Sequence, residues 1–264
     1  MSGRPEILAL ILARGGSRGI PRKNLMLVNG RPLIAYPICQ ARASRHITRT
    51  IVSTDDAEIA AVARDWGAET PFMRPVDIAG DFSTDIEAFR HALIWLRENE
   101  GYMPDAVVHL RATEPVRRVS VMDAAIEKFL AHPDADSLRT VSPAKETPYK
   151  MWHLEGDVMR PVVTLPDLPE AHSVGRQMLP QAYCQDGYVD VIRPHAILEL
   201  NSMVGQKVLG MATDEPRHDI DTLADVPATE AALRRMPPDE AVALLEAGPA
   251  RGAQPARASA GGQG

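Results

Sequence analysis

The chain has 264 residues, of which 45% are hydrophobic and 24% are charged, and its formal net charge is −6. This composition is ordinary for a globular protein, and the length allows one large domain or one domain with an appendage. The acidic balance argues against a nucleic-acid partner, because the basic residues cluster locally rather than dominate. No apolar run reaches the roughly 18 residues of a membrane span, and the first residues lack a signal-peptide core. The two cysteines, Cys39 and Cys184, are far apart and lack metal-ligand spacing, which is typical of reduced cysteines in a cytoplasmic protein. Together with the lack of a membrane span or signal peptide, this predicts a cytoplasmic protein without a membrane partner.

Short apolar runs alternate with helical patterns along the first half of the chain. Residues 7–12 are wholly apolar, which is typical of a strand buried on both faces of a parallel sheet. Further strands are predicted at residues 50–53, 69–73, 106–110 and 137–141. Helices are predicted from Pro32, at residues 57–66 behind a cap from Asp55 or Asp56, after a cap at residues 83–85, and at residues 119–131. The alternation predicts an α/β fold in which helices flank a right-handed, mostly parallel sheet.

The alternation stops between residues 145 and 180, where prolines are frequent. The stretch MWHLEGDVMRPV predicts a hairpin that turns at residues 155–157, and insertions with exposed apolar residues often build a subunit contact. The sheet is predicted to resume at residues 188–192, 207–211 and 218–220. Thr222 is expected to cap a helix with Asp225 in a capping box, and residues 233–245 to be helical. Residues 1–247 would then form one domain, followed by a disordered tail at residues 248–264, which contains no core-forming residues.

A basic, glycine-rich loop follows the first strand. It contains Arg14, Gly15, Gly16, Ser17, Arg18, Gly19, Arg22 and Lys23. Glycines let backbone N–H groups come close to a ligand, and the four cations supply charge for a polyanion. The loop is neither a P-loop nor a G-x-G-x-x-G turn, and its concentrated charge favours a nucleoside triphosphate. The alternative is a flexible, solvated basic loop without a ligand.

Two carboxylates, Asp219 and Asp221, stand on either side of Ile220. On a strand, residues two apart point to the same face, so both side chains would meet at one place. Mg²⁺ is commonly held by one or two carboxylates together with substrate phosphates, so the pair predicts a metal site. The alternative is a pair of surface acids, in which Asp221 merely caps the following helix.

The segment from Arg111 to Arg117 follows a predicted strand, at the edge of the sheet where ligands bind in open α/β folds. Its two arginines could meet an anionic substrate, although an ordinary loop with solvated arginines has the same composition. The segment from Arg176 to Gln181, and Asp186 with Gly187, are unremarkable by themselves.

Taken in order, these segments resemble the acylneuraminate cytidylyltransferases, which are the CMP-nonulosonate synthetases. LARGGSRGIPRKNL at residues 12–25 is similar to the N-terminal signature of that family. Its later motifs are similar to VSTDD at 52–56, RPVDIAGD at 74–81, RATEPVR at 111–117, RQMLPQAY at 176–183 and DIDT at 219–222. The resemblance covers about residues 6–232.

The resemblance implies a GT-A-like (Rossmann-like) fold with a small dimerisation insertion at residues 143–185, and hence a homodimer. It implies transfer of CMP from CTP to the anomeric hydroxyl of an acidic 2-keto sugar, with release of pyrophosphate and with Mg²⁺ as cofactor. The phosphates would be held by Arg14, Gly15, Gly16, Ser17, Arg18 and Lys23. The nucleoside would be seated by Asn24, Arg74 and Ser83. The sugar would be bound by Arg111, Thr113, Arg176, Gln177 and Asp186, and the metal by Asp219 and Asp221. The catalytic residues would be Arg14, Lys23, Asp219 and Asp221.

The sugar half of the sequence departs from that family. Sialic-acid enzymes commonly have Gln-Pro-Thr-Ser at the place of residues 111–114, Asn at Asp186, and an aromatic residue near Val189 and Asp190. An additional cation and additional acids indicate an altered sugar acid, so a legionaminic- or pseudaminic-type sugar fits as well as N-acetylneuraminate. Two alternatives stay open: a CMP-KDO synthetase or another sugar nucleotidyltransferase, and a non-catalytic protein that binds the nucleotide.

Overall fold

The computed structural model describes residues 3–17 and 19–249, and its centre is a six-stranded sheet in the order β10-β6-β9-β5-β1-β4. β1 (Ile7–Leu12) pairs in parallel with β4 (Arg49–Ser53) and β5 (Ala106–His109), and β10 (Val208–Ala212) pairs in parallel with β6 (Ser137–Pro143). Only β9 (Tyr183–Ile192) runs antiparallel to its two neighbours, β5 and β6. The mostly parallel α/β sheet is therefore confirmed.

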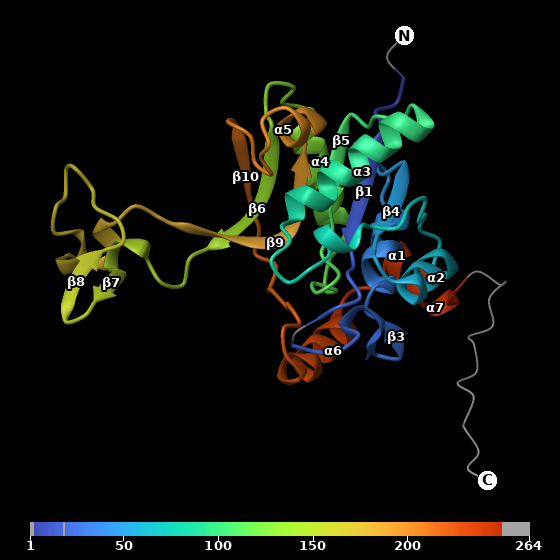
Figure 1. Ribbon diagram of the computed structural model, residues 1–264. Helices are drawn as coiled ribbons and strands as arrows, with labels where there is room; N and C mark the ends of the chain where they lie inside the picture. The colour runs from blue at the N-terminus through green and yellow to red at the C-terminus, as the bar shows by residue number, and fades with distance from the viewer. Residues whose placement is uncertain (1–2, 18, 250–264) are drawn as a thin grey trace.

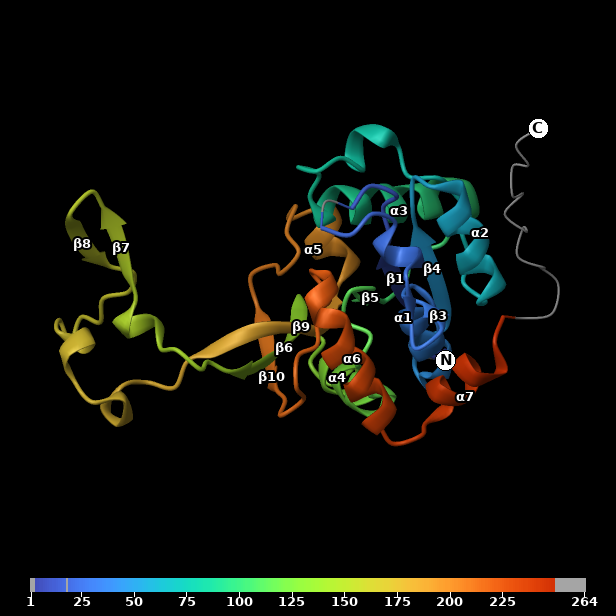
Figure 2. The ribbon, with the colours of Figure 1, turned by 90° about the horizontal axis from the view of Figure 1, so that it is seen from below.

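Helices cover both faces of this sheet (Figures 1 and 2). Alternate residues of β1 enter two different cores: Ile7, Ala9 and Ile11 pack on one face, and Leu8 and Leu10 on the other. The first core also contains residues of α1 (Ala35–Ala43), α2 (Ala57–Asp65), α4 (Val119–Leu130) and α7 (Glu240–Ala247). The second contains residues of α3 (Asp85–Glu100) and α5 (Pro194–Leu198). This two-sided burial explains why the β1 sequence has no polar alternation.

Several element boundaries differ from the sequence-based predictions. Pro32 lies in β3 (Arg31–Pro32), which pairs with β2 (Leu27–Val28), and α1 begins only at Ala35. Residues 69–73 were wrongly predicted as a strand: Glu69 makes one isolated bridge with Ile51, because Pro71 has no N–H with which to extend the ladder.

The predicted C-terminal elements also change. Residues 218–220 are not a strand, and the backbone N–H of Ile220 instead donates to the carbonyl of Thr113 at 2.8 Å. The single helical stretch predicted at residues 233–245 is two helices, α6 (Val226–Arg235) and α7, because two consecutive prolines after Met236 interrupt it. The capping box of Thr222 and Asp225 is confirmed. The tail prediction concerns mainly residues 250–264, which lie outside the described residues.

The insertion extends away from the rest of the molecule as an arm, on the left in Figures 1 and 2. The outer ends of β6 and β9 pair out to Pro143 and Tyr183 and carry it. The predicted hairpin is confirmed as β7 (Trp152–Glu155) and β8 (Val158–Pro161), with Gly156 at a positive φ of 62° in the turn. Large apolar side chains are exposed on the arm, namely Met151, Leu154, Val158, Met159, Val162, Met178 and Tyr183. Among the described helices, none has the length and apolar character to cross a membrane.

Candidate functional site

The glycine-rich loop leaves the carboxyl end of β1 and is held in place by the neighbouring segments. The backbone N–H of Gly15 donates to Asp55 Oδ1 at 2.9 Å, and Asn24 Nδ2 donates to the carbonyl of Arg14 at 3.0 Å. Of the two adjacent acids, Asp56 is the one that caps α2, which leaves Asp55 for the loop. The described part of the loop is therefore anchored rather than loosely solvated. Arg18 lies outside the described residues, so its role stays a prediction.

The loop meets the segment that carries the two candidate metal ligands. Lys23 Nζ donates to the carbonyl of Ile220 at 2.8 Å and lies 3.6 Å from Asp221 Oδ1. A Cβ added to Gly19 would lie 2.6 Å from the carbonyl oxygen of Asp221, so only glycine allows this approach. Ile220 is buried in a small core with Ile20. The two segments that were predicted to form one site are therefore brought together.

A cavity of about 370 Å³ lies between these segments, at the carboxyl ends of β1 and β5. Its lining includes seven of the predicted residues, namely Arg14, Ser17, Lys23, Asn24, Arg111, Thr113 and Asp221, and also Gly19 and His109. Ligands bind at this edge in open α/β sheets. The position, the charge of the lining and the volume suit the phosphate end of a nucleotide.

A second cavity, of about 260 Å³, shares Leu12, Arg14 and Asp85 with the first and contains the other two predicted nucleoside residues, Arg74 and Ser83. Burial lowers the pKa of Arg74, whose Nε donates to Ser53 Oγ at 3.1 Å. Arg14 stands between the two cavities, where its Nη1 donates to the carbonyl of Gly80 at 2.6 Å. The two cavities are therefore neighbours, and the three shared residues lie at their boundary. Gly15 and Gly16 belong to the same loop but do not line either cavity.

The two candidate metal ligands have different surroundings. Asp219 Oδ2 pairs with Arg217 Nη2 at 2.9 Å, whereas its Oδ1 is buried without a hydrogen-bond partner among the described residues. Asp221 has a side chain that is 74% exposed. Because residues 218–220 are not a strand, the two carboxylates do not share a strand face, and they line neighbouring cavities. An orphaned buried oxygen and an exposed carboxylate still fit Mg²⁺, which takes few protein ligands when phosphates complete its shell.

A smaller cavity of about 210 Å³ adjoins Asp219 on the side of β9, and its lining comprises Arg111, Glu114, Gln185, Asp186, Gly187, Arg217 and Asp219. Arg111 lines this cavity and the 370 Å³ cavity, so it marks their boundary. Glu114 Oε1 accepts the N–H of His218 at 2.8 Å, and burial raises the pKa of Glu114 to about 7. The oxygens of Asp186 already accept hydrogen bonds from Thr140, Tyr188 and Thr213.

The predicted residues Arg176 and Gln177 lie on the arm and line none of these three cavities. The side chain of Arg176 is 62% exposed and pairs with Glu146 at 3.0 Å. Their binding of the sugar stays a prediction, and within one chain the structure does not bring them to the cavities.

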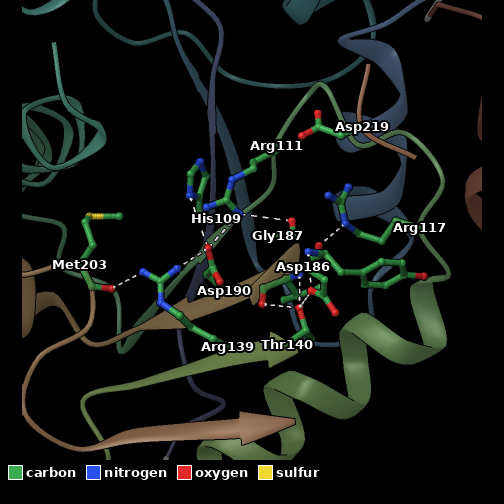
Figure 3. A network of polar contacts seen from close by, with 12 residues as sticks. His109, Arg111, Arg117, Arg139, Thr140, Asp186, Gly187, Asp190, Met203 and Asp219 are labelled. Carbon is green, nitrogen blue, oxygen red and sulfur yellow. Dashed lines mark hydrogen bonds and ion pairs between the residues drawn. The ribbon is translucent and has the colours of Figure 1, made fainter. Parts of the chain in front are cut away.

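A buried cluster beneath Arg111 was missed from the sequence (Figure 3). Asp190, which is fully buried on β9, lies between Arg111 and Arg139, and His109 packs beside them. Burial and the three neighbouring arginines hold the pKa of His109 well below its ordinary value, so the imidazole is neutral. A charged residue inside the apolar run YVDVI was the available signal, because buried acids need partners.

Comparisons with known proteins identify the family of the chain. The family model described as "Cytidylyltransferase" matches residues 8–158. The chain is 30% identical over 230 residues to post-translational flagellin modification protein B of Campylobacter coli, covering 85% of this chain and 94% of that protein. It is 31% identical over 226 residues to CMP-N,N′-diacetyllegionaminic acid synthase of Campylobacter jejuni, with the same 85% and 94% coverage.

The fold has a counterpart among solved structures. CMP:2-keto-3-deoxy-manno-octonic acid synthetase, solved in complex with CTP, superimposes with a TM-score of 0.63 at 15% identity, covering 87% of this chain and 99% of that one. At this identity the likeness concerns the fold alone. The match to the family model and the two relatives that align over nearly their whole length show that this chain belongs to the cytidylyltransferases, in the family of the CMP-nonulosonate synthetases.

Proposed function

We propose that the protein transfers CMP from CTP to the anomeric hydroxyl of a nonulosonic sugar acid and releases pyrophosphate. The observation that carries this proposal is the junction at which Lys23 and Gly19 meet Ile220 and Asp221 over a cavity lined by cations. Family membership and the similarity to a legionaminic acid synthase support it.

In this proposal, the anomeric hydroxyl attacks the α-phosphorus of CTP in line with the departing pyrophosphate. Arg14 and Lys23 would neutralise the triphosphate and the charge that builds on the leaving group. The two cavities that meet at Arg111 would place the nucleotide on one side and the sugar on the other. The protein therefore contributes mainly positioning and charge, without a covalent intermediate.

Asp219 and Asp221 would hold Mg²⁺ in this reaction. When bound, the ion offsets phosphate charge and lowers the pKa of the attacking hydroxyl. Lys23 keeps the 219–222 segment in place through the carbonyl of Ile220, and Arg217 orients Asp219. The unpartnered Oδ1 of Asp219 supports the assignment, because a buried carboxylate oxygen without a donor is costly unless a ligand completes it.

The acceptor is proposed to be a sialic-type 2-keto acid, namely legionaminic or pseudaminic acid rather than N-acetylneuraminate. The altered residues around the sugar cavity, Arg111 and Glu114 above all, support this choice. KDO is the alternative acceptor, and the fold likeness to a solved synthetase at 15% identity does not bear on this choice. Because the substrate CTP and the free thiols of Cys39 and Cys184 suit the cytoplasm, we place the reaction there.

We also propose that the arm mediates a homodimer. Its exposed apolar side chains, such as Leu154 at 73% exposure, form a surface that a second copy would cover. Since the arm extends away from its own cavities, Arg176 and Gln177 could reach a sugar only in the partner's site.

Pyrophosphate release tests the proposed activity. The purified chain is incubated with CTP, MgCl₂ and, in turn, N-acetylneuraminate, N,N′-diacetyllegionaminate, pseudaminate or KDO. We expect release with at least one of the nine-carbon acids and its loss in EDTA. Turnover with KDO alone would establish the alternative enzyme. Tight binding of CTP without release from any acceptor would establish a non-catalytic nucleotide-binding protein.

A further inference from the structure

Asp190 is a fully buried acid in the middle of the sheet, and its only charged contacts among the described residues are with basic groups. Its Oδ2 lies 2.9 Å from Arg111 Nη1 and 3.0 Å from Arg139 Nη1. These contacts are ion pairs whose angles are not those of hydrogen bonds, and Oδ1 has no hydrogen-bond partner among the described residues. A carboxylate this deep in the protein is expensive unless it is compensated by charge.

The sheet register creates this cluster. Asp190 on β9 lies opposite His109 on β5 and opposite Arg139 on β6. Side chains directly opposite each other on neighbouring strands point to the same face, so all three meet there. Arg111 follows β5 by two residues and reaches back to the same carboxylate, as Figure 3 shows.

The contacts of Arg111 leave part of its guanidinium free. Nη1 makes the ion pair with Asp190 and donates to the carbonyl of Gly187 at 3.2 Å. Within residues 3–17 and 19–249, neither Nε nor Nη2 of Arg111 has a hydrogen-bond or ion-pair partner. Gly187 has a positive φ of 72°, and a Cβ there would lie 3.4 Å from Nη1, so the turn is shaped around the guanidinium. Arg111 is therefore held through Nη1, whereas its Nε and Nη2 are available to a ligand.

The local charge favours an anionic ligand. Two guanidinium groups share one carboxylate, and the neighbouring imidazole of His109 is neutral, so the cluster carries an excess of one positive charge. This excess stands at the boundary of the 370 Å³ and 210 Å³ cavities, because Arg111 lines both. A carboxylate accepts a fork of N–H groups from an arginine, which makes it the matching anion.

We propose that Asp190 is a positioning residue that holds Arg111 so that its free Nε and Nη2 bind the carboxylate of the sugar acid. Arg139 shares Asp190 and is itself held by the carbonyl of Met203 at 2.9 Å, so it fixes the carboxylate from the other side. This inference rests on the proposed function. It adds that Asp190 and Arg111 together select an acidic sugar over a neutral one.

The test compares two acceptors that differ only at the carboxyl group, which are the sugar acid that the wild-type chain converts and its uncharged methyl ester. Pyrophosphate release gives kcat/KM for each acceptor with the wild type, Asp190→Asn, Arg111→Gln and the double variant. We expect Asp190→Asn to lower kcat/KM for the acid by about tenfold to a hundredfold, mainly through KM, and to change the ester by less than about twofold. In the Arg111→Gln background, Asp190→Asn should add little, because there is no guanidinium left to position.

Two controls separate positioning from damage to the fold. The KM for CTP and the calorimetric affinity for CTP should stay within about twofold of wild type in Asp190→Asn. Asp134→Asn, which removes an exposed acid paired with Lys207 at the far end of β6, should leave the acid-to-ester ratio unchanged. If Asp190→Asn does not fold, Asp190→Glu provides the test. This variant keeps the negative charge but displaces the guanidinium of Arg111, so it should lower the acid-to-ester ratio of kcat/KM.

An acid-to-ester ratio that stays at the wild-type value in Asp190→Asn, or in Asp190→Glu if only that variant folds, would overturn the inference. So would a full additional loss from Asp190→Asn in the Arg111→Gln background. A wild-type chain that converts no sugar acid at all would instead refute the proposed function, and this inference with it.

Discussion

The contact between Gly19 and the backbone of Asp221 can be tested with one methyl group. Gly19→Ala would place a Cβ 2.6 Å from the carbonyl oxygen of Asp221, a backbone atom that cannot rotate away. Non-bonded heavy atoms settle at about 3.5 Å, so one of the two segments must move by roughly 1 Å. Overpacking of this kind costs about 1–3 kcal/mol of folding free energy.

The larger effect is expected on catalysis. A displacement of about 1 Å in groups that position a substrate can cost on the order of a hundredfold in rate. We therefore expect Gly19→Ala to lower kcat by about 10–100-fold. It should also raise the Mg²⁺ concentration needed for half-maximal rate, because Asp221 moves away from its position beside Lys23.

Pyrophosphate release during a Mg²⁺ titration measures both quantities. Gly210→Ala on β10 is the matched control, because a Cβ there meets nothing within 4 Å and the residue lies outside the cavities described above. A Gly19→Ala enzyme with the rate and Mg²⁺ dependence of wild type would refute the reasoning. Equal losses in both variants would show that the effect is not specific to the junction.

Three further predictions follow from other parts of the structure. Asp219→Asn should lower kcat much more than CTP affinity, and residual activity should no longer respond to EDTA, as rates and calorimetry would show. The pKa of Glu114 is about 7 in the folded protein, against an ordinary value of 4.5, so the folded state binds this proton more tightly than the unfolded state. The protein should therefore lose about 3 kcal/mol of folding free energy as the pH rises from 4.5 through 7. Denaturant unfolding of Glu114→Gln should lack this loss, making the variant more stable than wild type above pH 7. Leu154→Asp, on the exposed hairpin of the arm, should convert the proposed dimer into a monomer, which analytical ultracentrifugation would detect.

Each of these predictions has an outcome that contradicts it. Equal effects of Asp219→Asn on rate and CTP affinity would remove the metal from the proposed role of that residue. Parallel pH dependence in wild type and Glu114→Gln would show that the Glu114 proton does not contribute. A wild-type chain that sediments as a monomer would refute the dimer, and Leu154→Asp would then have no effect.

The position of the glycine-rich loop at the carboxyl end of β1 could be predicted from the sequence because its signals are local. The apolar run of β1 and the glycines and cations after it occupy consecutive positions, so their placement follows from one strand-to-loop connection. The partner segment could be recognised by its two acids, but its geometry could not. Residues 218–220 are held by separate hydrogen bonds to Thr113, Glu114 and Lys23 rather than by strand pairing.

The cluster around Asp190 depends on contacts that sequence patterns do not reveal. Asp190 meets Arg139 and Arg111 only because β9 lies between β5 and β6, and this strand order is not visible in the spacing of residues. Asp186 was predicted as a sugar ligand from a resemblance, whereas its oxygens are already occupied by Thr140, Tyr188 and Thr213. Its more direct role in the structure is to fix the backbone beside Gly187.

The bond from Lys23 to the carbonyl of Ile220 joins residues 197 positions apart. The glycine-rich loop is therefore synthesised well before the segment that it contacts. Because such distant contacts form late in folding, a nascent or prematurely terminated chain that stops before residue 219 would contain the whole β1 signature yet have no means of closing the junction. The junction between the two segments therefore requires synthesis of the chain beyond residue 221.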